Sequence, residues 1–367
     1  MITIINNREG LISIKPIWIE LFNADINATP FQSFEYILSA IETIASARGT
    51  LHIILIKDET SGLWTAIFPL ILSKKGELRF INSDHSDFCA PLIRPEFNHY
   101  NLYEEFSRYI NGESKIKGIL FDNICSSNQL ISVLKPHFKL FICVTSDYYS
   151  TIPVYRIKND KDYFDAFRFI KSHGKKKLRS AEKKLVDCDL RIFSESAGDE
   201  YPRWEIDKIV CKMISDGVRT TQYFSPNMLL FWQKLYKENI IEILALYQND
   251  EIKSCNLVFV DKKHNEYIKW IMIYTESRWN LVVNILFMKY LYQKESCTIN
   301  FARGIYDYKL VNFHPDVKPL FRIYISKTKS GHLKNMLKLF FFNSLAITKF
   351  PLTLIIKIKG ILNRFRK

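Results

Sequence analysis

Apolar residues in the first 150 positions alternate between helical and extended spacing. Their recurrence every three or four residues predicts a helix over about 34–47, and Pro30 favours a turn just before it. An earlier helix is expected around residues 17–22. Four apolar runs have the length of β-strands: Leu51–Ile56, Trp64–Leu72, Leu78–Ile81 and Ile116–Phe121. Helices and strands that alternate in this way predict an α/β layer domain.

The pattern pauses at Pro136 and again at Ser150–Pro153, so we place a domain boundary near residue 150. This boundary divides the chain into residues 1–150, residues 151–326 and a tail over 327–367.

Helices and strands also alternate in the second segment, but in a different order. A helix over about 160–170 is expected to start at Asp160 as its cap, and a break at 172–174 should precede a very basic helix over about 175–185. No glycine-rich turn follows a first strand, which argues against a Rossmann fold. Further elements are helices over about 203–215, 225–238 and 281–294, and strands Ile241–Tyr247, Lys253–Val260, Glu266–Tyr274 and Thr298–Phe301.

Composition narrows the class of protein. The chain has 367 residues, and its 27 Phe, 19 Tyr and 6 Trp exclude a disordered chain, which could not bury so many rings. Seven scattered cysteines without a CxxC pair suit a reducing compartment. The sequence has neither a signal-peptide pattern nor an uncharged apolar stretch of about 18 residues, so we expect a cytoplasmic protein.

The net charge of +14 is spread unevenly. Residues 1–150 carry 13 Lys+Arg and 16 Asp+Glu, residues 151–325 carry 29 and 22, and residues 326–367 carry 10 and none. We therefore expect a basic amphipathic tail that contacts an anionic membrane surface, peripherally on its inner face, and no DNA partner. The alternative is a terminal helix folded back on the domain.

Four stretches, taken together, resemble a known family. Their order and spacing over about 300 residues are similar to the CelD-like (cellulose-biosynthesis type) acetyltransferase family of the GNAT superfamily, which is related to the FemAB-type transferases. The stretches are Thr29–Ser33 before a helix, Ala66–Leu70, the basic run Gly174–Leu185, and Phe301–Lys309.

The resemblance implies two GNAT-like (FemAB-like) halves with mixed β-sheets and flanking helices. It also implies transfer of an acyl group from acyl-CoA, acetyl-CoA above all, to an amino or hydroxyl group of a sugar in surface polysaccharide or envelope biosynthesis. The chain departs from the family at Asn300, where Asp is usual, and at Trp279–Val282, where a Pro-Gly pair is usual. It also lacks the pyrophosphate loop [QR]xxGx[GA], so a different acyl donor remains open.

The last of the four stretches contains the residues best suited to the chemistry. Arg303 and Lys309 suit a phosphate or a carbonyl oxygen, and Tyr308 suits protonation of a leaving thiolate. Gly304 allows a tight backbone path, and Gly304, Asp307 and Arg303 are expected to contact the acceptor. The alternative is a turn at a strand end with solvated charges.

A second candidate segment follows the strand Leu78–Ile81. His85 lies between two carboxylates there and is suited to act as a general base for an attacking amine or hydroxyl. The resemblance implies an acidic residue followed by an aromatic one, here Asp87 and Phe88. The alternative is a polar surface turn.

The donor is expected beside the strand Glu266–Tyr274. Period-2 spacing predicts that Trp270 and Tyr274 share a face, where their rings stack on the donor or the sugar, unless they are simply core residues. Arg278 and Asn280 lie at the start of the next helix, whose free N–H groups suit a phosphate.

Other chemistries find less support. The eight histidines form no HxxH or HxxxH pair, so no metal is expected, and the absent GxSxG elbow favours direct transfer over an acyl-enzyme. The basic helix over 175–185 suits a phosphate or an acidic glycan, or is a solvated face. Two other functions remain open: aminoacyl transfer from a charged tRNA, as in the Fem proteins, and a non-catalytic membrane- or nucleic-acid-binding protein on a degenerate GNAT fold.

Overall fold

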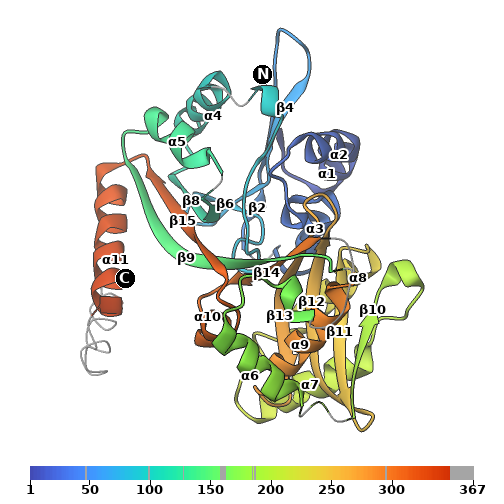
Figure 1. The fold of residues 1–367 in the computed structure, drawn as a ribbon. Helices are drawn as coiled ribbons and strands as arrows, with labels where there is room; N and C mark the ends of the chain where they lie inside the picture. The colour runs from blue at the N-terminus through green and yellow to red at the C-terminus, as the bar shows by residue number, and fades with distance from the viewer. Residues whose placement is uncertain are drawn as a thin grey trace.

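The computed structural model describes residues 1–45, 48–97, 100–126, 128–157, 163–183, 185, 187–293 and 296–347, with side chains of the last helix up to residue 339. Within these residues the strands form two sheets. The smaller sheet has the antiparallel order β1-β3-β4-β7, and the larger has eleven strands in the order β10-β11-β12-β13-β14-β9-β15-β8-β6-β5-β2. The larger sheet continues from one half of the chain into the other (Figure 1).

The first half is built mainly of short elements. Its strands are β1 (Ile2–Ile5), β2 (Thr50–Leu51), β3 (Ile53–Lys57), β4 (Trp64–Phe68), β5 (Leu70–Leu72), β6 (Glu77–Phe80), β7 (Leu92–Ile93), β8 (Gly118–Cys125) and β9 (Phe141–Val154). Its helices are α1 (Arg8–Ser13), α2 (Lys15–Ala24), α3 (Phe34–Ala40), the π-helical turn Ile41–Ala45, α4 (Tyr100–Gly112) and α5 (Leu130–Leu134), with 3-10 turns at Pro30–Gln32, Pro95–Phe97 and Lys135–His137.

The second half has longer strands. They are β10 (Cys188–Phe193), β11 (Ile241–Gln248), β12 (Glu251–Asp261), β13 (Glu266–Tyr274), β14 (Cys297–Arg303) and β15 (Asp316–Ser326). Its helices are α6 (Ser172–Glu182), α7 (Arg203–Ser215), α8 (Pro226–Lys237), α9 (Trp279–Leu291), α10 (Asp307–Phe313) and α11 (Lys329–Ile347), with 3-10 turns at Tyr163–Ala166 and Glu195–Ala197.

Several predicted elements differ from the structure for local reasons. The single strand predicted over Trp64–Leu72 is two strands in different sheets, because Pro69 has no N–H to continue the ladder. The helix predicted over 160–170 is wrong where the structure describes it, since residues 163–166 form a 3-10 turn; Asp160 lies outside the described residues. The break predicted at 172–174 is also wrong, because α6 begins at Ser172.

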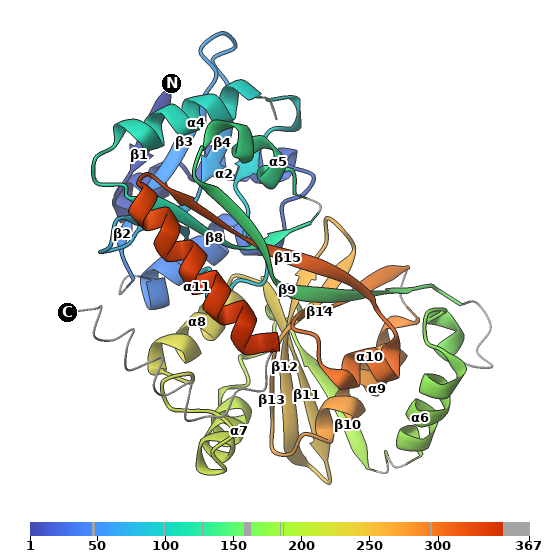
Figure 2. The same cartoon turned by 90° about the vertical axis from the view of Figure 1, so that its left-hand side faces the viewer.

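Strand β9 is the largest element that the sequence analysis missed. The expected boundary near residue 150 falls inside this strand, which pairs antiparallel with β14 from Val154 to Tyr149 and with β15 from Thr151 to Phe141. Because β15 also pairs with β8, strands β9 and β15 join the strands of both halves into one sheet (Figures 1 and 2).

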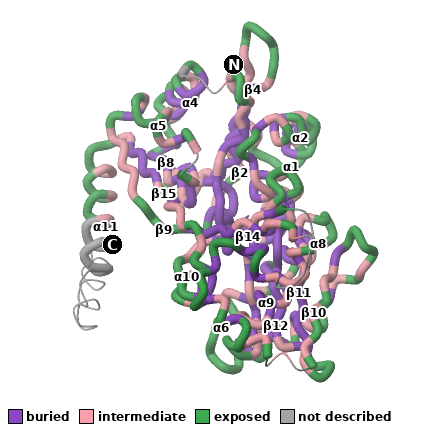
Figure 3. The backbone as a smooth tube through the Cα atoms, in the orientation of Figure 1, coloured by how far each residue is buried: buried purple, intermediate pink, exposed green. Residues whose placement is uncertain are grey.

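Both halves also share a hydrophobic core. One buried cluster contains residues of helices α1–α3 from the first half and of helices α7 and α8 and strands β11–β13 from the second. Phe31 and Phe259 meet in it with ring centroids 4.5 Å apart. Two further clusters lie beneath α4 and α5 in the first half and beneath α6 and α9 in the second. Figure 3 shows buried residues along the inner strands of the larger sheet, β11–β13 among them.

The last helix, α11, packs along the β15 side of the molecule (Figure 2). Asn335 donates a hydrogen bond to Ser326 and faces the body of the protein, whereas Leu333, Met336 and Leu337 are about half exposed. Among the described helices none has the length and apolarity needed to cross a membrane.

Candidate functional site

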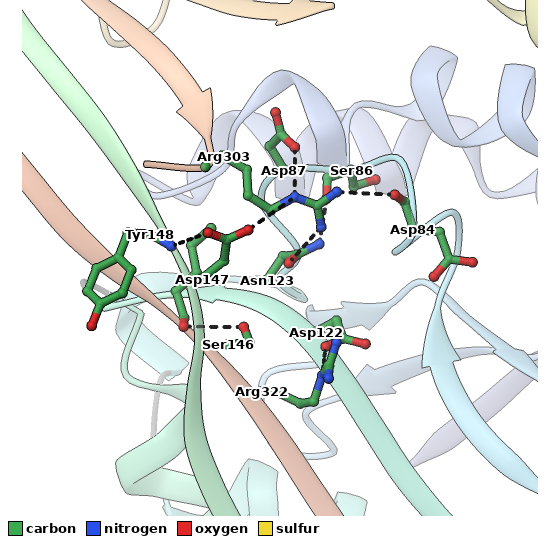
Figure 4. Close-up of polar contacts among 12 residues, drawn as sticks. Asp84, Ser86, Asp87, Asp122, Asn123, Ser146, Asp147, Tyr148, Arg303 and Arg322 are labelled. Atoms are coloured by element: carbon green, nitrogen blue, oxygen red, sulfur yellow. Dashed lines mark hydrogen bonds and ion pairs between the residues drawn. The ribbon is translucent and has the colours of Figure 1, made fainter. Parts of the chain in front are cut away.

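The carboxyl end of β14 brings the two halves together around one guanidinium. Arg303 Nε lies 3.5 Å from Asp87 Oδ1 and 3.9 Å from Asp147 Oδ2, and Nη1 donates to Asn123 Oδ1 at 3.1 Å (Figure 4). Nη2 lies 3.4 Å from the carbonyl oxygen of Asp84. The site therefore unites the two stretches that the sequence analysis selected separately, and it adds Asn123 and Asp147, which the analysis missed.

The loop after β6 is held rigidly in place. Asn123 donates from Nδ2 to the carbonyl oxygens of Ser83 and Ser86, at 2.9 and 2.8 Å. Asn82 donates to the hydroxyl of Tyr36, which in turn lies 2.9 Å from Ser86 Oγ. Asn82 and Asn123 both have positive φ values, 59° and 58°, a conformation that Asn tolerates better than most residues. These contacts fix Asp87 beneath Arg303.

Asp87 has the electrostatic character of a general base. Burial raises its pKa to about 6, although Arg303 acts in the opposite direction. A carboxylate with this pKa is mostly ionised at neutral pH and still basic enough to accept a proton from an acceptor group.

His85 is placed differently from the expectation. Its Nε2 lies 3.1 Å from an Arg48 guanidinium nitrogen, and Arg48 also forms an ion pair with Asp84. Burial, and then Arg48, lowers the pKa of His85 to about 4, so the ring is neutral at physiological pH. Because the guanidinium can only donate, it occupies the basic lone pair that a general base would use. This geometry makes Asp87 the better candidate base of the two.

Lys309 is buried against the backbone of its own turn. Its ammonium donates to the carbonyl oxygens of Phe301, Arg303 and Gly304, at 2.6, 3.3 and 3.0 Å. Burial lowers the pKa of Lys309 to about 8, with Asp87 and Asp147 opposing the change. With its donors directed at carbonyl groups, Lys309 holds the strand end in shape and does not project toward a ligand.

Gly304 is required at its position for a local reason. Its φ is 96°, and a Cβ there would lie 2.7 Å from the ring of Tyr306. Asp307 follows in the first turn of α10 and is exposed. The turn thus places Arg303 inward and leaves Asp307 at the surface.

Strands β13 and β14 diverge next to this turn. Their parallel pairing covers only Glu266–Ile268 against Thr298–Asn300, although both strands continue beyond it. Tyr308 reaches into this region, with its hydroxyl 3.9 Å from the sulfur of Met272. Burial raises the pKa of Tyr308, so the phenol stays protonated and can act as a proton donor. We call this divergence the β13–β14 opening.

The aromatic pair predicted on β13 does not obey simple alternation. A β-bulge lies at Trp270, because Lys269 pairs with Val258 and Ile271 pairs with the adjacent Leu257. The shared face predicted for Trp270 and Tyr274 is therefore wrong. Trp270 packs on three core rings and donates from Nε1 to the carbonyl oxygen of His85 at 2.8 Å; the rings are Phe31, Phe231 and Phe259.

Helix α9 begins at Trp279, two residues before its predicted start. Arg278 precedes its first residue, forms an ion pair with Glu276 at 3.0 Å and stacks over Trp279. Asn280 lies in the first turn with its Oδ1 buried and without a hydrogen-bond partner. Both residues predicted for donor binding lie at the start of this helix. Its first three N–H groups already donate to the carbonyl oxygens of residues 276–278, so the expectation of free N–H groups for a phosphate is wrong.

The structure also reveals polar residues that the sequence analysis passed over. Lys269 on β13, Asn256 on β12 and Asn284 on α9 are each at least 96% buried. A single Lys in the otherwise apolar run Tyr267–Tyr274 was the signal that could have identified them. Among the described residues, no group of His, Cys, Asp and Glu could hold a metal ion.

Neither a comparison with protein-family models nor one with curated proteins found a match. Solved structures do match. One is the C-terminal DUF2156 domain of a protein named as a lysylphosphatidylglycerol synthetase from Agrobacterium fabrum, with a TM-score of 0.58, 10% identity and coverage of 89% of this chain and 95% of that one. L-PGS from Bacillus licheniformis matches with a TM-score of 0.57 and 10% identity, covering 88% of this chain and 93% of that one. FemX matches with a TM-score of 0.56 and 10% identity, covering 85% of this chain and 96% of that one.

These likenesses show the fold. The chain has the mixed α/β architecture of two GNAT-like, FemAB-like halves with flanking helices, as the sequence predicted. At about 10% identity they do not identify a particular family within that fold, and the CelD-like resemblance stays a prediction.

Proposed function

We propose that the protein is an acyltransferase that moves an acyl group from an acyl-CoA to an amino or hydroxyl group of a sugar in surface polysaccharide or envelope biosynthesis. One observation carries the proposal: Arg303 and the buried Asp87 lie beside the β13–β14 opening on a GNAT-like fold. The CelD-like resemblance supplies the sugar acceptor, and the fold supports acyl transfer in general.

The proposed reaction is a direct displacement. The acceptor nitrogen or oxygen attacks the thioester carbonyl, forming a new C–N or C–O bond, and the C–S bond breaks with its electron pair on sulfur. Asp87 takes the proton lost by the acceptor and then releases it to water, while Tyr308 gives a proton to the thiolate and regains one from that water. Backbone N–H groups of β13 beyond Ile268, no longer paired with β14, suit the transient oxyanion.

The proposed donor site combines the opening with the start of α9. The phosphates of CoA would meet the guanidinium of Arg278 just before the helix, with Asn280 beside it. The thioester would then lie along β13, near Tyr308 and within reach of Asp87.

This function is tested by incubating the full chain with several radiolabelled acyl-CoA donors, acetyl-CoA among them, and a panel of amino sugars, nucleotide amino sugars and polysaccharide precursors. Labelled product with at least one acceptor, lost in Asp87→Asn, is the expected result. Release of no CoA with any acceptor would contradict the proposed donor and acceptor class.

Aminoacyl transfer from a charged tRNA is a second candidate, favoured by one feature. Helix α6 exposes Lys176 and Lys177, and Lys183 follows it, on a surface next to α9 and α10. A row of exposed cations suits a phosphate backbone. Salt-sensitive binding of tRNA that is lost when these three residues become Glu would support this candidate over the first.

We further propose that α11 and the following tail attach the protein peripherally to an anionic membrane. Leu333, Met336 and Leu337 are exposed, and Lys329, Lys334 and Lys338 lie among them. No acidic residue occurs from Lys327 to the end of the sequence, so the surface is complementary to anionic headgroups. Residues 348–367 of the predicted tail lie outside the described residues.

A further inference from the structure

A group of polar side chains is buried between α9 and the sheet. Lys269 donates from Nζ to Asn284 Oδ1 and lies 6.0 Å above the ring of Phe301. Asn256 lies two residues along β12 from Val258, the cross-strand partner of Lys269, so Asn256 and Lys269 are on the same face. Helix α9 packs on that face of β12 and β13. We call Asn256, Lys269 and Asn284 the polar cluster.

Most hydrogen-bonding capacity of the polar cluster is unused. Both side-chain polar atoms of Asn256 and Nδ2 of Asn284 are buried without a partner. Nε1 of Trp279 and Oδ1 of Asn280, in the first turn of α9, are also buried without a hydrogen-bond partner. Buried polar groups are almost always hydrogen-bonded, so these atoms are available to a ligand that offers matching groups, or to water.

The cluster lies at the inner end of the β13–β14 opening. The last residue of β13 that pairs with β14 is Ile268, and Lys269 follows it directly. Beyond this point the two strands are no longer paired with each other. A ligand bound between the diverging strands would therefore have Lys269 at the point where they converge.

The charge of the cluster indicates which ligand fits. Lys269 forms no ion pair among the described residues, and Lys309 is the charged group that most affects it. Burial lowers the pKa of Lys269 to about 7, as expected for an ammonium without a carboxylate partner. The unpartnered donors, two amide nitrogens and an indole N–H, also outnumber the two unpartnered amide oxygens. A group that offers several acceptors and a negative charge is the best complement.

We propose that the polar cluster binds the carboxylate of a dicarboxylic acyl group, so that the preferred donor is an acyl-CoA such as succinyl-CoA instead of acetyl-CoA. This inference rests on the proposed acyl-CoA donor and specifies its acyl end. An aminoacyl group is disfavoured by the same site, since its ammonium would lie beside the buried Lys269.

The test compares three probes on the full chain by isothermal titration: CoA, acetyl-CoA and succinyl-CoA. Succinyl-CoA is expected to bind at least about tenfold more tightly than the other two, because one charge-assisted contact is worth about that much. Lys269→Met should remove this preference and leave the affinity for CoA unchanged. Lys289→Met is the matched control, because Lys289 is on α9 but forms an ion pair with Glu182 at the surface, and it should keep the preference.

Asn256→Leu gives an independent variant that retains the charge and should lose part of the preference, so the test does not depend on the folding of Lys269→Met alone. Equal affinity of the wild-type chain for acetyl-CoA and succinyl-CoA would overturn the proposal. So would an unaltered preference in Lys269→Met, which would mean that water alone fills the cluster.

Failure of the proposed function would look different. If no CoA compound binds, the proposed acyl-CoA donor is wrong. The melting temperature of the protein is then measured with succinate alone at millimolar concentration. Stabilisation of the wild-type chain that is lost in Lys269→Met and kept in Lys289→Met would support the carboxylate site on its own. No stabilisation by succinate would overturn it.

Discussion

Arg303, at the end of β14, holds its guanidinium 3.5 Å from the carboxylate of Asp87, in the loop that follows β6. One residue comes from each half of the chain. The pair depends on β9 and β15, which join strands of the two halves into one sheet and bring the end of β14 against that loop. A site at this junction can exist only when both halves are folded together.

Arg303→Gln is expected to lower the transfer rate by about 100-fold or more, because the site loses the charge that orients Asp87. The fold should survive, since Arg303 is about one third exposed. Turnover and melting temperature are measured together, with Arg191→Gln, at a half-exposed position on the edge strand β10, as the control. An unchanged rate would remove Arg303 from the proposed site.

The pH dependence should follow Asp87. The base must be ionised, so the rate is expected to rise with pH through about 6, the pKa to which burial raises this carboxyl. Asp87→Asn should abolish this rise along with the activity. A rate independent of pH between about 5 and 8 would argue against Asp87 as the base.

The same pKa has a consequence for stability. The unfolded carboxyl titrates near its model value of 3.8 and the folded one near 6, so the folded state binds more protons between these values. Stability from this group therefore falls as pH rises from about 4 to 6. Urea unfolding of wild type and Asp87→Asn across this range should show a smaller fall in the variant. Parallel curves would contradict the burial of Asp87.

Lys309→Met should destabilise the protein by about 2–4 kcal/mol, because three carbonyl oxygens at the end of β14 lose their donor. The change is measured by denaturant unfolding. Lys318→Met, at a half-exposed position beside Asp316, is the control and should have little effect. A stable Lys309→Met variant without activity would instead place Lys309 in direct contact with substrate.

Lys269→Met should make the protein more stable at neutral pH. The ammonium binds its proton less tightly in the folded state, with a pKa of about 7 against 10.5 unfolded. The unfolded state therefore holds more protons between these values, and wild-type stability rises with pH across that window. The variant should have a higher melting temperature near pH 7 and a flatter pH profile. A lower melting temperature would mean that Lys269 has a compensating partner.

The proposed membrane attachment is tested by co-sedimentation with vesicles of phosphatidylcholine and phosphatidylglycerol in equal parts. Changing Lys329, Lys334 and Lys338 together to Glu should weaken binding by about 100-fold or more, since each cation near the surface contributes about 1 kcal/mol. High salt should weaken the wild-type interaction as well. The same change at Lys176, Lys177 and Lys183 is the control; equal losses in both variants would mean that net charge, not α11, is responsible.

The sequence by itself determined the local elements and part of the site. Apolar spacing depends only on neighbours along the chain, so it correctly predicted the helix over 203–215 and the core of β12 and β13. The segment Phe301–Lys309 and the pair His85 and Asp87 were also recognisable, because their polar residues stand directly after apolar strands.

Only the tertiary structure decided how these parts meet. The roles of His85 and Lys309 depend on Arg48 and on backbone carbonyl groups, which no local pattern reveals. The bulge at Trp270 and the burial of Lys269 arise from pairing between strands and from packing under α9. Long-range strand pairing brings together residues far apart in the chain, and burial then sets their pKa values; neither is fixed by the spacing of residues in the sequence.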